Sequence, residues 1–450
     1  MYFNSIEYLC YKGVCGMSTN LRESVWDRNG VVQRMIGDTP LPRMVKVRQK
    51  LNDDVLEDIP GEIKKQINQQ KIAGTIKPGM TIAVTCGSRG IANLALIIKE
   101  TVAALKELGA KPFVFPAMGS HGGGTAEGQR EMIEGFGVTE EYVGAPIKAS
   151  MEVVQVASLD DGRPVYIDKY ASEADGIVLV GRIKAHTAFR GPYESGMLKM
   201  MAIGVAKHQG AEACHSQGFR KMAENVVAYG TAILNNANIL FGLSIIENAH
   251  DETNRIIALT PEEILEEEPK LLIEAKEKMA RIFFDKLDIM VVDEIGKNHS
   301  GDGMDPNITG SYCTEFASGP PRVEEYVVLN LSEATHGNCI GMGMANYTTK
   351  KVFDQADFDA GYPNALTARV AITVRTPMVL KTDRLAIQAA MYVRTGNGVD
   401  NPRVLRIRNS SHVDEIWISE SMLDEAKKNP DIEILEGPKE MEFDAEGNLL

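Results

Sequence analysis

The sequence predicts an α/β protein built from two α/β domains with mainly parallel sheets. Short apolar, partly β-branched runs alternate with longer amphipathic segments, which is the order of strands and helices in a parallel sheet. Glycine-rich turns directly follow several of these runs, and the alternation starts again after a long charged segment. The chain has 450 residues, enough for two or three ordinary domains.

The first domain is expected to contain four strands. Its order of strand, helix, strand and helix implies a parallel pair with a right-handed crossover. The first helix carries its apolar residues on one stripe and stops at Gly109, and Thr125 is the expected N-cap of the second helix. The expected strands are 81–85, 112–117, 176–180 and 239–247, and the expected helices are 91–108, 125–136 and 219–234.

A charged helix over 262–284 is expected to connect this domain to a second one. The expected strands of the second domain are 287–293, 326–331, 371–374 and 404–408. The predicted organisation is an upstream extension over 1–16 with Met17 as an alternative start, an N-terminal domain over 17–260, a connecting helix over 261–284 and a C-terminal domain over 285–450. We expect the active site in the cleft between the two domains, where binding pockets are common.

Composition limits the function classes. The net charge of −14 argues against nucleic acid and against an anionic membrane surface, because both attract basic patches. The 6 cysteines are scattered without a CxxC pair, and no apolar run approaches the length of a membrane span. The first 16 residues lack the apolar core of a signal peptide, so a cytoplasmic protein is expected. The sequence does not indicate an oligomeric state.

Polar side chains follow three of the predicted strands at the points where those strands end. Arg89 follows the first strand, His121 follows the second, and Lys184 and His186 follow the third. Ligands bind at the carboxyl ends of strands in open parallel sheets, so we expect these groups at one edge. The glycines around His121 allow close backbone approach, and an arginine can hold a carboxylate with two parallel hydrogen bonds.

Two further residues, Lys199 and His215, extend this constellation along the chain. Lys199 lies in an apolar run, where it is either a lysine that extends its amine to solvent or an amine with a lowered pKa that acts as a covalent anchor. Taken singly, every one of these residues has an ordinary structural explanation, such as a tight turn or a surface histidine. Taken together, they predict a site.

Four short motifs resemble the nickel-pincer-dependent lactate racemase family. They are Gly-Ser-His at 119–121, Ile-Lys-Ala-His at 183–186, Gly-Met-Leu-Lys at 196–199 and Ala-Cys-His at 213–215, preceded by a Ser-Arg turn at 88–89. The motif-level resemblance covers most of residues 80–220. It implies a two-domain α/β enzyme that racemises or epimerises a small anionic 2-hydroxy acid.

The resemblance also implies a cofactor, pyridinium-3-thioamide-5-thiocarboxylic acid mononucleotide, which forms a pincer around nickel. Lys199 matches the lysine that carries this nucleotide through a thioamide, and His215 matches the histidine that binds the nickel. Ser88 and Lys184 match positions that contact the cofactor. The enzymes that make the cofactor are the implied partners.

The resemblance assigns His121 and His186 as the acid and base, with the hydride of C2 passing to the pincer and returning to either face of a planar keto acid. Arg89 matches the arginine that positions the substrate carboxylate. The family takes a second carboxylate-binding lysine from its C-terminal domain, and Lys297 in the polar loop 296–307 is the matching candidate. The loop 333–338, with His336 and Asn338, is either a second substrate-side loop or a plain turn.

Two other function classes stay open at the sequence level. One is a zinc enzyme that uses His121, His186 and His215, although these histidines lack the spacing of an HExxH motif. The other is a protein without catalysis that binds the cofactor or a hydroxy acid. The sequence does not identify the side chain of the acid.

Overall fold

A computed structural model describes residues 30–88 and 90–450, and it divides the chain into two compact units. Of the described residues, the N-terminal unit contains those of 50–282 and 306–320, and the C-terminal unit contains 30–49, 283–305 and 321–450. Both units are therefore assembled from separate stretches of chain, whereas the sequence suggested continuous domains. The predicted extension over 1–16 lies outside the described residues, and so does Arg89.

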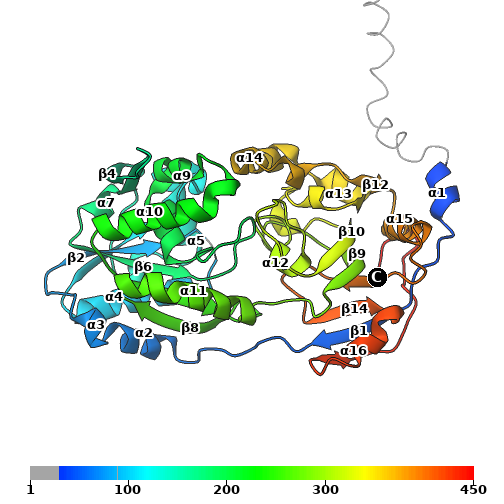
Figure 1. The fold of residues 1–450 in the computed structure, drawn as a ribbon, viewed down its shortest axis with the longest axis horizontal. Helices are drawn as coiled ribbons and strands as arrows, with labels where there is room; N and C mark the ends of the chain where they lie inside the picture. The colour runs from blue at the N-terminus through cyan, green and yellow to red at the C-terminus, as the bar shows by residue number, and fades with distance from the viewer. Residues whose placement is uncertain (1–29, 89) are drawn as a thin grey trace, which may run out of the picture. The chain divides into compact units, whose positions relative to one another are not determined.

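The N-terminal unit is built on a five-stranded sheet with the order β3-β2-β6-β7-β8 (Figure 1). All neighbouring strands are parallel except the last pair, in which β8 runs antiparallel to β7. The four strands that the sequence predicts for the first domain are confirmed. The strands are β2 (Thr81–Cys86), β3 (Lys111–Pro116), β6 (Gly176–Arg182), β7 (Ile239–Glu247) and β8 (Thr253–Leu259).

Helices cover both faces of this sheet, because successive strand residues point to opposite sides. Ile82 and Val84 of β2 pack into one buried cluster with α2 and α4, while Ala83 packs into a second cluster with α8, α10 and α11. Figure 1 shows α10 and α4 on opposite sides of β6. The bounds are α2 (Ile59–Ile67), α4 (Leu94–Glu107), α8 (Met197–Lys199), α10 (Met222–Asn236) and α11 (Pro261–Lys278).

Shorter elements complete the N-terminal unit, among them a two-stranded hairpin of β4 and β5. A π-helix, η3, continues α8 directly into α9. These elements are α3 (Gln70–Ala73), α5 (Ala126–Gly135), α6 (Glu140–Val143), β4 (Val153–Ser158), β5 (Pro164–Asp168), α7 (Lys169–Ser172), η3 (Met200–Val205), α9 (Lys207–His215) and α12 (Pro306–Thr309).

The C-terminal unit contains an eight-stranded sheet with the order β12-β11-β10-β9-β13-β14-β1-β15. The five strands from β12 to β13 are parallel, and the pairs that involve β14, β1 and β15 are antiparallel. The strands are β1 (Met44–Gln49), β9 (Lys286–Val292), β10 (Arg322–Val328), β11 (Tyr347–Thr349), β12 (Met378–Leu380), β13 (Val404–Ile407), β14 (Glu415–Ser419) and β15 (Ile432–Ile434).

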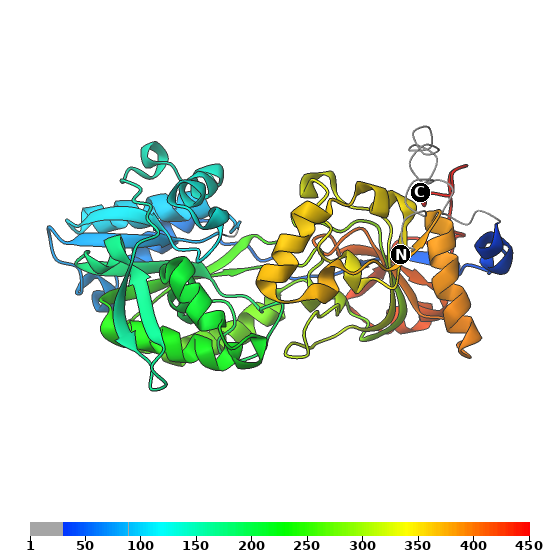
Figure 2. The same ribbon diagram turned by 90° about the horizontal axis from the view of Figure 1, so that it is seen from above.

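Helix α15 packs its apolar face on the parallel strands of this sheet, and Figure 2 shows it in orange. Leu385 and Ile387 of α15 lie in one buried cluster with Ile289 of β9 and Val327 of β10. The helices of the unit are α1 (Val31–Ile36), α13 (Lys350–Gln355), α14 (Phe358–Ala368), α15 (Asp383–Gly396) and α16 (Leu423–Ala426).

Two expectations from the sequence are corrected. The expected strand over 371–374 is a 3-10 helix, Ala371–Val374, which shows that its short apolar run had no neighbouring strand to pair with. The charged helix expected over 262–284 ends at Lys278, and it packs on the sheet of the N-terminal unit through Ile264 and Leu272. The fold class, two α/β domains with mainly parallel sheets, is confirmed. Within the described ranges, no helix combines the length and apolar character needed to cross a membrane.

Candidate active site

Ser88 and His121 meet where β2 and β3 end. The Nδ1 atom of His121 is hydrogen-bonded to the Ser88 hydroxyl. A hydroxyl can donate or accept, so this contact is compatible with a proton on either ring nitrogen of His121. Thr125 caps α5 by accepting a hydrogen bond of 3.1 Å from the Gly128 amide, as the sequence predicts.

The turn that carries His121 has little room for side chains. Gly122 has a φ of +64°, and a Cβ atom there would lie 2.6 Å from the backbone nitrogen of Gln129. A side chain at this position would therefore push the turn away from α5. From α5, Gln129 Nε2 donates to the carbonyl oxygens of Gly119 at 2.9 Å and His121 at 3.2 Å. The buried side-chain amide of Gln129 thus fixes the backbone of the turn on the side that faces α5.

A buried ion pair supports that amide. Lys207 Nζ donates to Gln129 Oε1 at 3.0 Å and to the Pro116 carbonyl at 2.6 Å, and it lies 3.3 Å from Asp168 Oδ2. Both charged side chains are fully buried. Burial lowers the pKa of Lys207 and raises the pKa of Asp168, and the charge of each partner opposes the shift in the other.

His186 lies in the loop after β6. Its backbone amide donates to Glu194 Oε2 at 2.8 Å, and its carbonyl accepts from the Arg190 guanidinium. Its Nδ1 accepts a hydrogen bond of 3.0 Å from the Ala188 amide. An amide can only donate, so the neutral ring carries its proton on Nε2. The ring also packs against Phe189, with centroids 4.3 Å apart.

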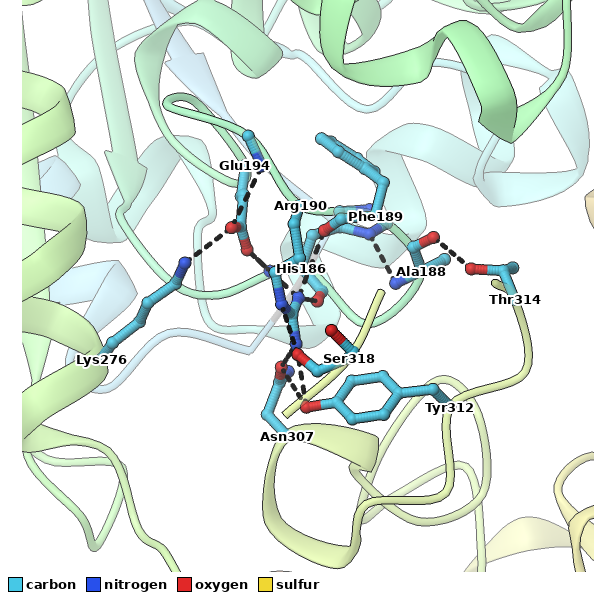
Figure 3. A network of polar contacts seen from close by, with 11 residues as sticks. His186, Ala188, Phe189, Arg190, Glu194, Lys276, Asn307, Tyr312, Thr314 and Ser318 are labelled. Carbon is cyan, nitrogen blue, oxygen red and sulfur yellow. Dashed lines mark hydrogen bonds and ion pairs between the residues drawn. The ribbon is translucent and has the colours of Figure 1, made fainter. Parts of the chain in front are cut away.

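Glu194 is the centre of the network around His186, which Figure 3 shows from close by. Its side chain is fully buried, and it accepts from Lys276 Nζ at 2.6 Å and from Arg190 Nη1 at 3.3 Å. A buried carboxylate is tolerated when charged donors surround it, and two cations do so here.

Arg190 connects this loop to the segment 306–320, which follows it by more than 100 positions in the sequence. Its Nη2 donates to Asn307 Oδ1 at 2.6 Å and to the Tyr312 hydroxyl at 2.9 Å, and the guanidinium lies 5.0 Å from the centre of the Tyr312 ring. Its Nε donates to the Ser318 carbonyl at 3.1 Å. The Thr314 hydroxyl adds a bond to the Ala188 carbonyl.

Lys199 is half-buried and ends α8, a single turn whose start is fixed by Glu268 of α11. Glu268 Oε2 accepts from the backbone amides of Met197 at 2.9 Å and Leu198 at 3.3 Å. A Cβ atom at residue 196 would lie 2.3 Å from Glu268 Oε1, so glycine is required there. Burial raises the pKa of Glu268 to about 7.

The helix that follows Lys199 packs against two turns, the one after β2 that contains Ser88 and the one after β3 that contains His121. The methyl group of Met200 would lie 3.4 Å from a Cβ atom at Gly87, the residue before Ser88. Further along, the Gly119 amide donates to the Gly204 carbonyl at 3.3 Å. These contacts belong to the π-helix η3, a feature that is often found at functional sites.

His215 ends α9, and its Nδ1 lies 2.7 Å from the Ala211 carbonyl oxygen. A carbonyl only accepts, so Nδ1 carries the proton and Nε2 is the nitrogen with the lone pair. This is the arrangement that metal-binding histidines commonly adopt. Burial raises the pKa of the neighbouring Cys214 thiol to about 12, and the positive charges of Arg163 and Lys199 oppose this shift.

Ser88, His121, His186, Lys199 and His215 all belong to the N-terminal unit, and of these Ser88 and His121 are in direct contact. Lys184 joins them through its backbone, which pairs with Ser195 at 3.0 and 3.2 Å, and its amine lies 3.6 Å from Asp251. Among residues 30–88 and 90–450, no group of three or more His, Cys, Asp or Glu side chains is arranged to hold a metal ion.

The residues expected from the second domain lie in the C-terminal unit. Lys297 Nζ donates to Asn364 Oδ1 at 2.7 Å, and Asn338 Nδ2 donates to the same oxygen at 2.9 Å. His336 ends a 3-10 helix with a φ of +48°. The loop 296–307 is shared between the units, because residues 306 and 307 pack with the N-terminal unit.

Sequence reasoning missed the residues that hold the site in place, namely Gln129, Arg190, Glu194, Lys207 and Glu268. One local signal was the pair Arg190 and Glu194, two opposite charges four positions apart in the loop after β6. Glu268 lies in a helix with many exposed acidic residues, so nothing in the sequence distinguishes it.

This fold and these side chains define an α/β protein with a polar site at the carboxyl edge of a parallel sheet. Residues 31–226 match the model of the lactate racemase N-terminal domain. The matched stretch includes every proposed site residue except Lys297, and over it the chain is similar to the lactate racemase N-terminal domain.

Two solved structures match about four fifths of this chain. The lactate racemase apoprotein from Thermoanaerobacterium thermosaccharolyticum is 12% identical, with 82% of this chain and 99% of that chain covered and a TM-score of 0.49. A protein from Thermotoga maritima is 13% identical, with 80% and 98% covered and a TM-score of 0.49. No curated protein matches this chain in sequence.

Proposed function

We propose that the protein is a racemase or epimerase of a 2-hydroxy carboxylic acid that works with a nickel-pincer nucleotide bound to Lys199. The observation that carries this proposal is the packing of the helix after Lys199 against the turn that contains Ser88, which is itself bonded to His121. The match to the lactate racemase N-terminal domain supports the same reaction class.

The residues present suit such a cofactor. Lys199 would supply the amine for the thioamide, and His215 would bind nickel through Nε2, because its Nδ1 proton is taken by the Ala211 carbonyl. Ser88 and Lys184 would contact the nucleotide. When bound at these residues, the cofactor would supply the chemistry of reversible hydride transfer at C2 of the substrate.

The two histidines would move the hydroxyl proton of the substrate. His186 carries its proton on Nε2 in the neutral ring, so it begins as the hydrogen-bond donor to the substrate oxygen. His121 begins as the base, because the Ser88 hydroxyl can accept from Nδ1 and leave the lone pair on Nε2. Histidine suits both roles, since its ordinary pKa of about 6.5 is close to neutral pH.

The substrate carboxylate would be held by cations. Arg89 follows directly after Ser88 in the sequence, and Lys297 would contribute from the C-terminal unit. An arginine in this role gives two parallel hydrogen bonds and so fixes the orientation of the acid.

The test is a racemisation assay on a panel of 2-hydroxy acids, with protein coexpressed with the enzymes that make the cofactor. His121→Ala and His186→Ala should each lower kcat by about 10²- to 10⁴-fold, the usual contribution of general acid–base catalysis. His250→Ala, which removes an exposed histidine of the same unit, is the matched control and should leave kcat unchanged. Undiminished turnover in both site variants would refute the acid–base role.

A further inference from the structure

His186 is held by more contacts than its own loop supplies. Its amide is bonded to Glu194, its carbonyl to Arg190 and its ring nitrogen Nδ1 to the Ala188 amide. The Ala188 carbonyl is bonded in turn to the Thr314 hydroxyl. These polar contacts of His186 therefore lead within one step to Arg190, Glu194 or the segment 306–320.

Arg190 is the residue at which these contacts meet. Its guanidinium donates to two backbone carbonyls of the loop, those of His186 and Phe189, and to the buried Glu194. On its other side it donates to three groups of the segment 306–320: Asn307, Tyr312 and the Ser318 carbonyl. Its own backbone amide donates to the Phe316 carbonyl at 2.9 Å.

Only a guanidinium can make this set of contacts. It offers five donors in one rigid plane and can stack on an aromatic ring, whereas a lysine amine is a single charged point with three donors. The Tyr312 ring lies 5.0 Å from the Arg190 guanidinium carbon, so the segment holds both the face and the edge of the group.

We propose that Arg190 is a positioning residue, through which the segment 306–320 fixes the backbone of His186 and keeps its neutral ring protonated on Nε2. The importance of this for turnover rests on the proposed function, because it assumes that His186 meets the substrate oxygen. The fixed tautomer itself does not depend on that function. Loss of the Arg190 guanidinium removes the bonds that tie the His186 and Phe189 carbonyls to the segment and leaves the Thr314–Ala188 bond and the backbone bond to Phe316 in place. The loosened ring of His186 then samples both tautomers.

The first arm of the test uses the protein without cofactor. Long-range proton–nitrogen correlation spectra of protein with ¹⁵N-labelled histidine report which ring nitrogen carries the proton, and His186→Gln assigns the signal. The wild type should show a single neutral form with the proton on Nε2, and Arg190→Lys should show exchange between the two forms. The same single form in Arg190→Lys would overturn the proposal.

The second arm uses protein loaded with cofactor. Arg190→Lys should lower kcat by about 100-fold, the cost of a displacement of about 1 Å at a reacting group, with KM and the nickel content unchanged. A fall in nickel content equal to the fall in kcat would overturn the proposal, because Arg190 would then act on cofactor binding. A wild type without turnover would count against the proposed function alone, and the first arm would still decide the tautomer.

A second pair of variants guards against a folding defect in Arg190→Lys. Asn307→Ala with Tyr312→Phe keeps the arginine and the aromatic ring but removes the two side-chain acceptors in the segment. This double variant should show the same tautomer exchange and a smaller fall in kcat, about 10-fold. Arg394→Lys is the matched control, because it replaces a similarly buried guanidinium of the C-terminal unit, which is bonded to Asp288 at 2.9 Å. Equal spectral changes in the control would overturn the proposal.

Discussion

The turn of His121 and the loop of His186 fix their histidines in different ways. The His121 turn is held by the helix that follows it, because Gln129 of α5 bonds two of its carbonyls and a buried Lys207–Asp168 pair supports Gln129. The His186 loop is held by a segment more than 100 positions later in the chain. The position of His121 therefore depends on buried polar side chains that pack against its turn. The position of His186 depends on hydrogen bonds to a segment that is distant in the sequence.

The hydrogen bonds of the two imidazole rings also differ. His121 is bonded to a serine hydroxyl, which accepts or donates, whereas His186 accepts from a backbone amide, which only donates. The adaptable contact suits a group that gains and loses a proton, and the fixed contact suits a group that presents a proton from a set position. The two loops therefore support two unequal roles for two residues of the same type.

The largest expected effect is a loss of stability when the buried ion pair next to the His121 turn is broken. Lys207→Met leaves the Asp168 carboxylate buried without its partner, so the free energy of unfolding should fall by about 3 to 5 kcal/mol. Lys207→Met combined with Asp168→Asn leaves no unpaired charge and keeps an acceptor for the Ala171 amide, so it should recover part of that loss. Urea titrations measure both. A double variant as unstable as the single one would show that the loss does not come from an unpaired buried carboxylate.

A smaller expected effect is the pH dependence of stability that Glu268 causes. It serves as a reference for the comparison, because Glu268 is bonded to neither histidine. The pKa of Glu268 is raised by burial to about 7 from 4.5, so the folded state holds a proton that the unfolded state releases. Its contribution to stability is full below about pH 4.5 and is lost as pH rises towards about 7, a change of about 3 kcal/mol. Glu268→Gln keeps an acceptor for the Met197 and Leu198 amides and removes this dependence.

The measurement is the free energy of unfolding of both proteins at several values between about pH 4 and about pH 8. The wild type should lose stability relative to Glu268→Gln as pH rises through this range. A constant difference would show that the Glu268 carboxyl has the same pKa in the folded and unfolded states, so that burial does not raise it. The Nε2 tautomer of His186 should be the same in both proteins, because Glu268 contacts α8 and not the loop of His186.

The comparison also explains what could be predicted from the sequence. The strands, the N-cap at Thr125 and the glycine-rich turn of His121 follow from local patterns of apolar, capping and glycine residues. The contacts of Glu194 with Lys276, and of Arg190 with Asn307, join positions that no periodicity links. The assembly of the N-terminal unit from two separate stretches escaped prediction for the same reason.

The prediction of a strand over 371–374 was wrong for a similar reason, because it also depended on contacts that the local sequence does not show. A short apolar run is compatible with a strand or with a buried turn, and only the neighbouring strand decides between them. The role of Lys199 posed the same problem, because a lysine in an apolar run is either packed along its stem or used for chemistry. Its place at the end of α8, next to the turn of Ser88, supports the second interpretation.

The most direct test of the central claim is the intact mass of the protein coexpressed with the cofactor-making enzymes. We predict an increase equal to the mass of the pincer nucleotide with nickel, which Lys199→Ala abolishes and Lys221→Ala, an exposed lysine of the same unit, retains. An adduct that persists in Lys199→Ala, or a wild type without any adduct, would contradict the account.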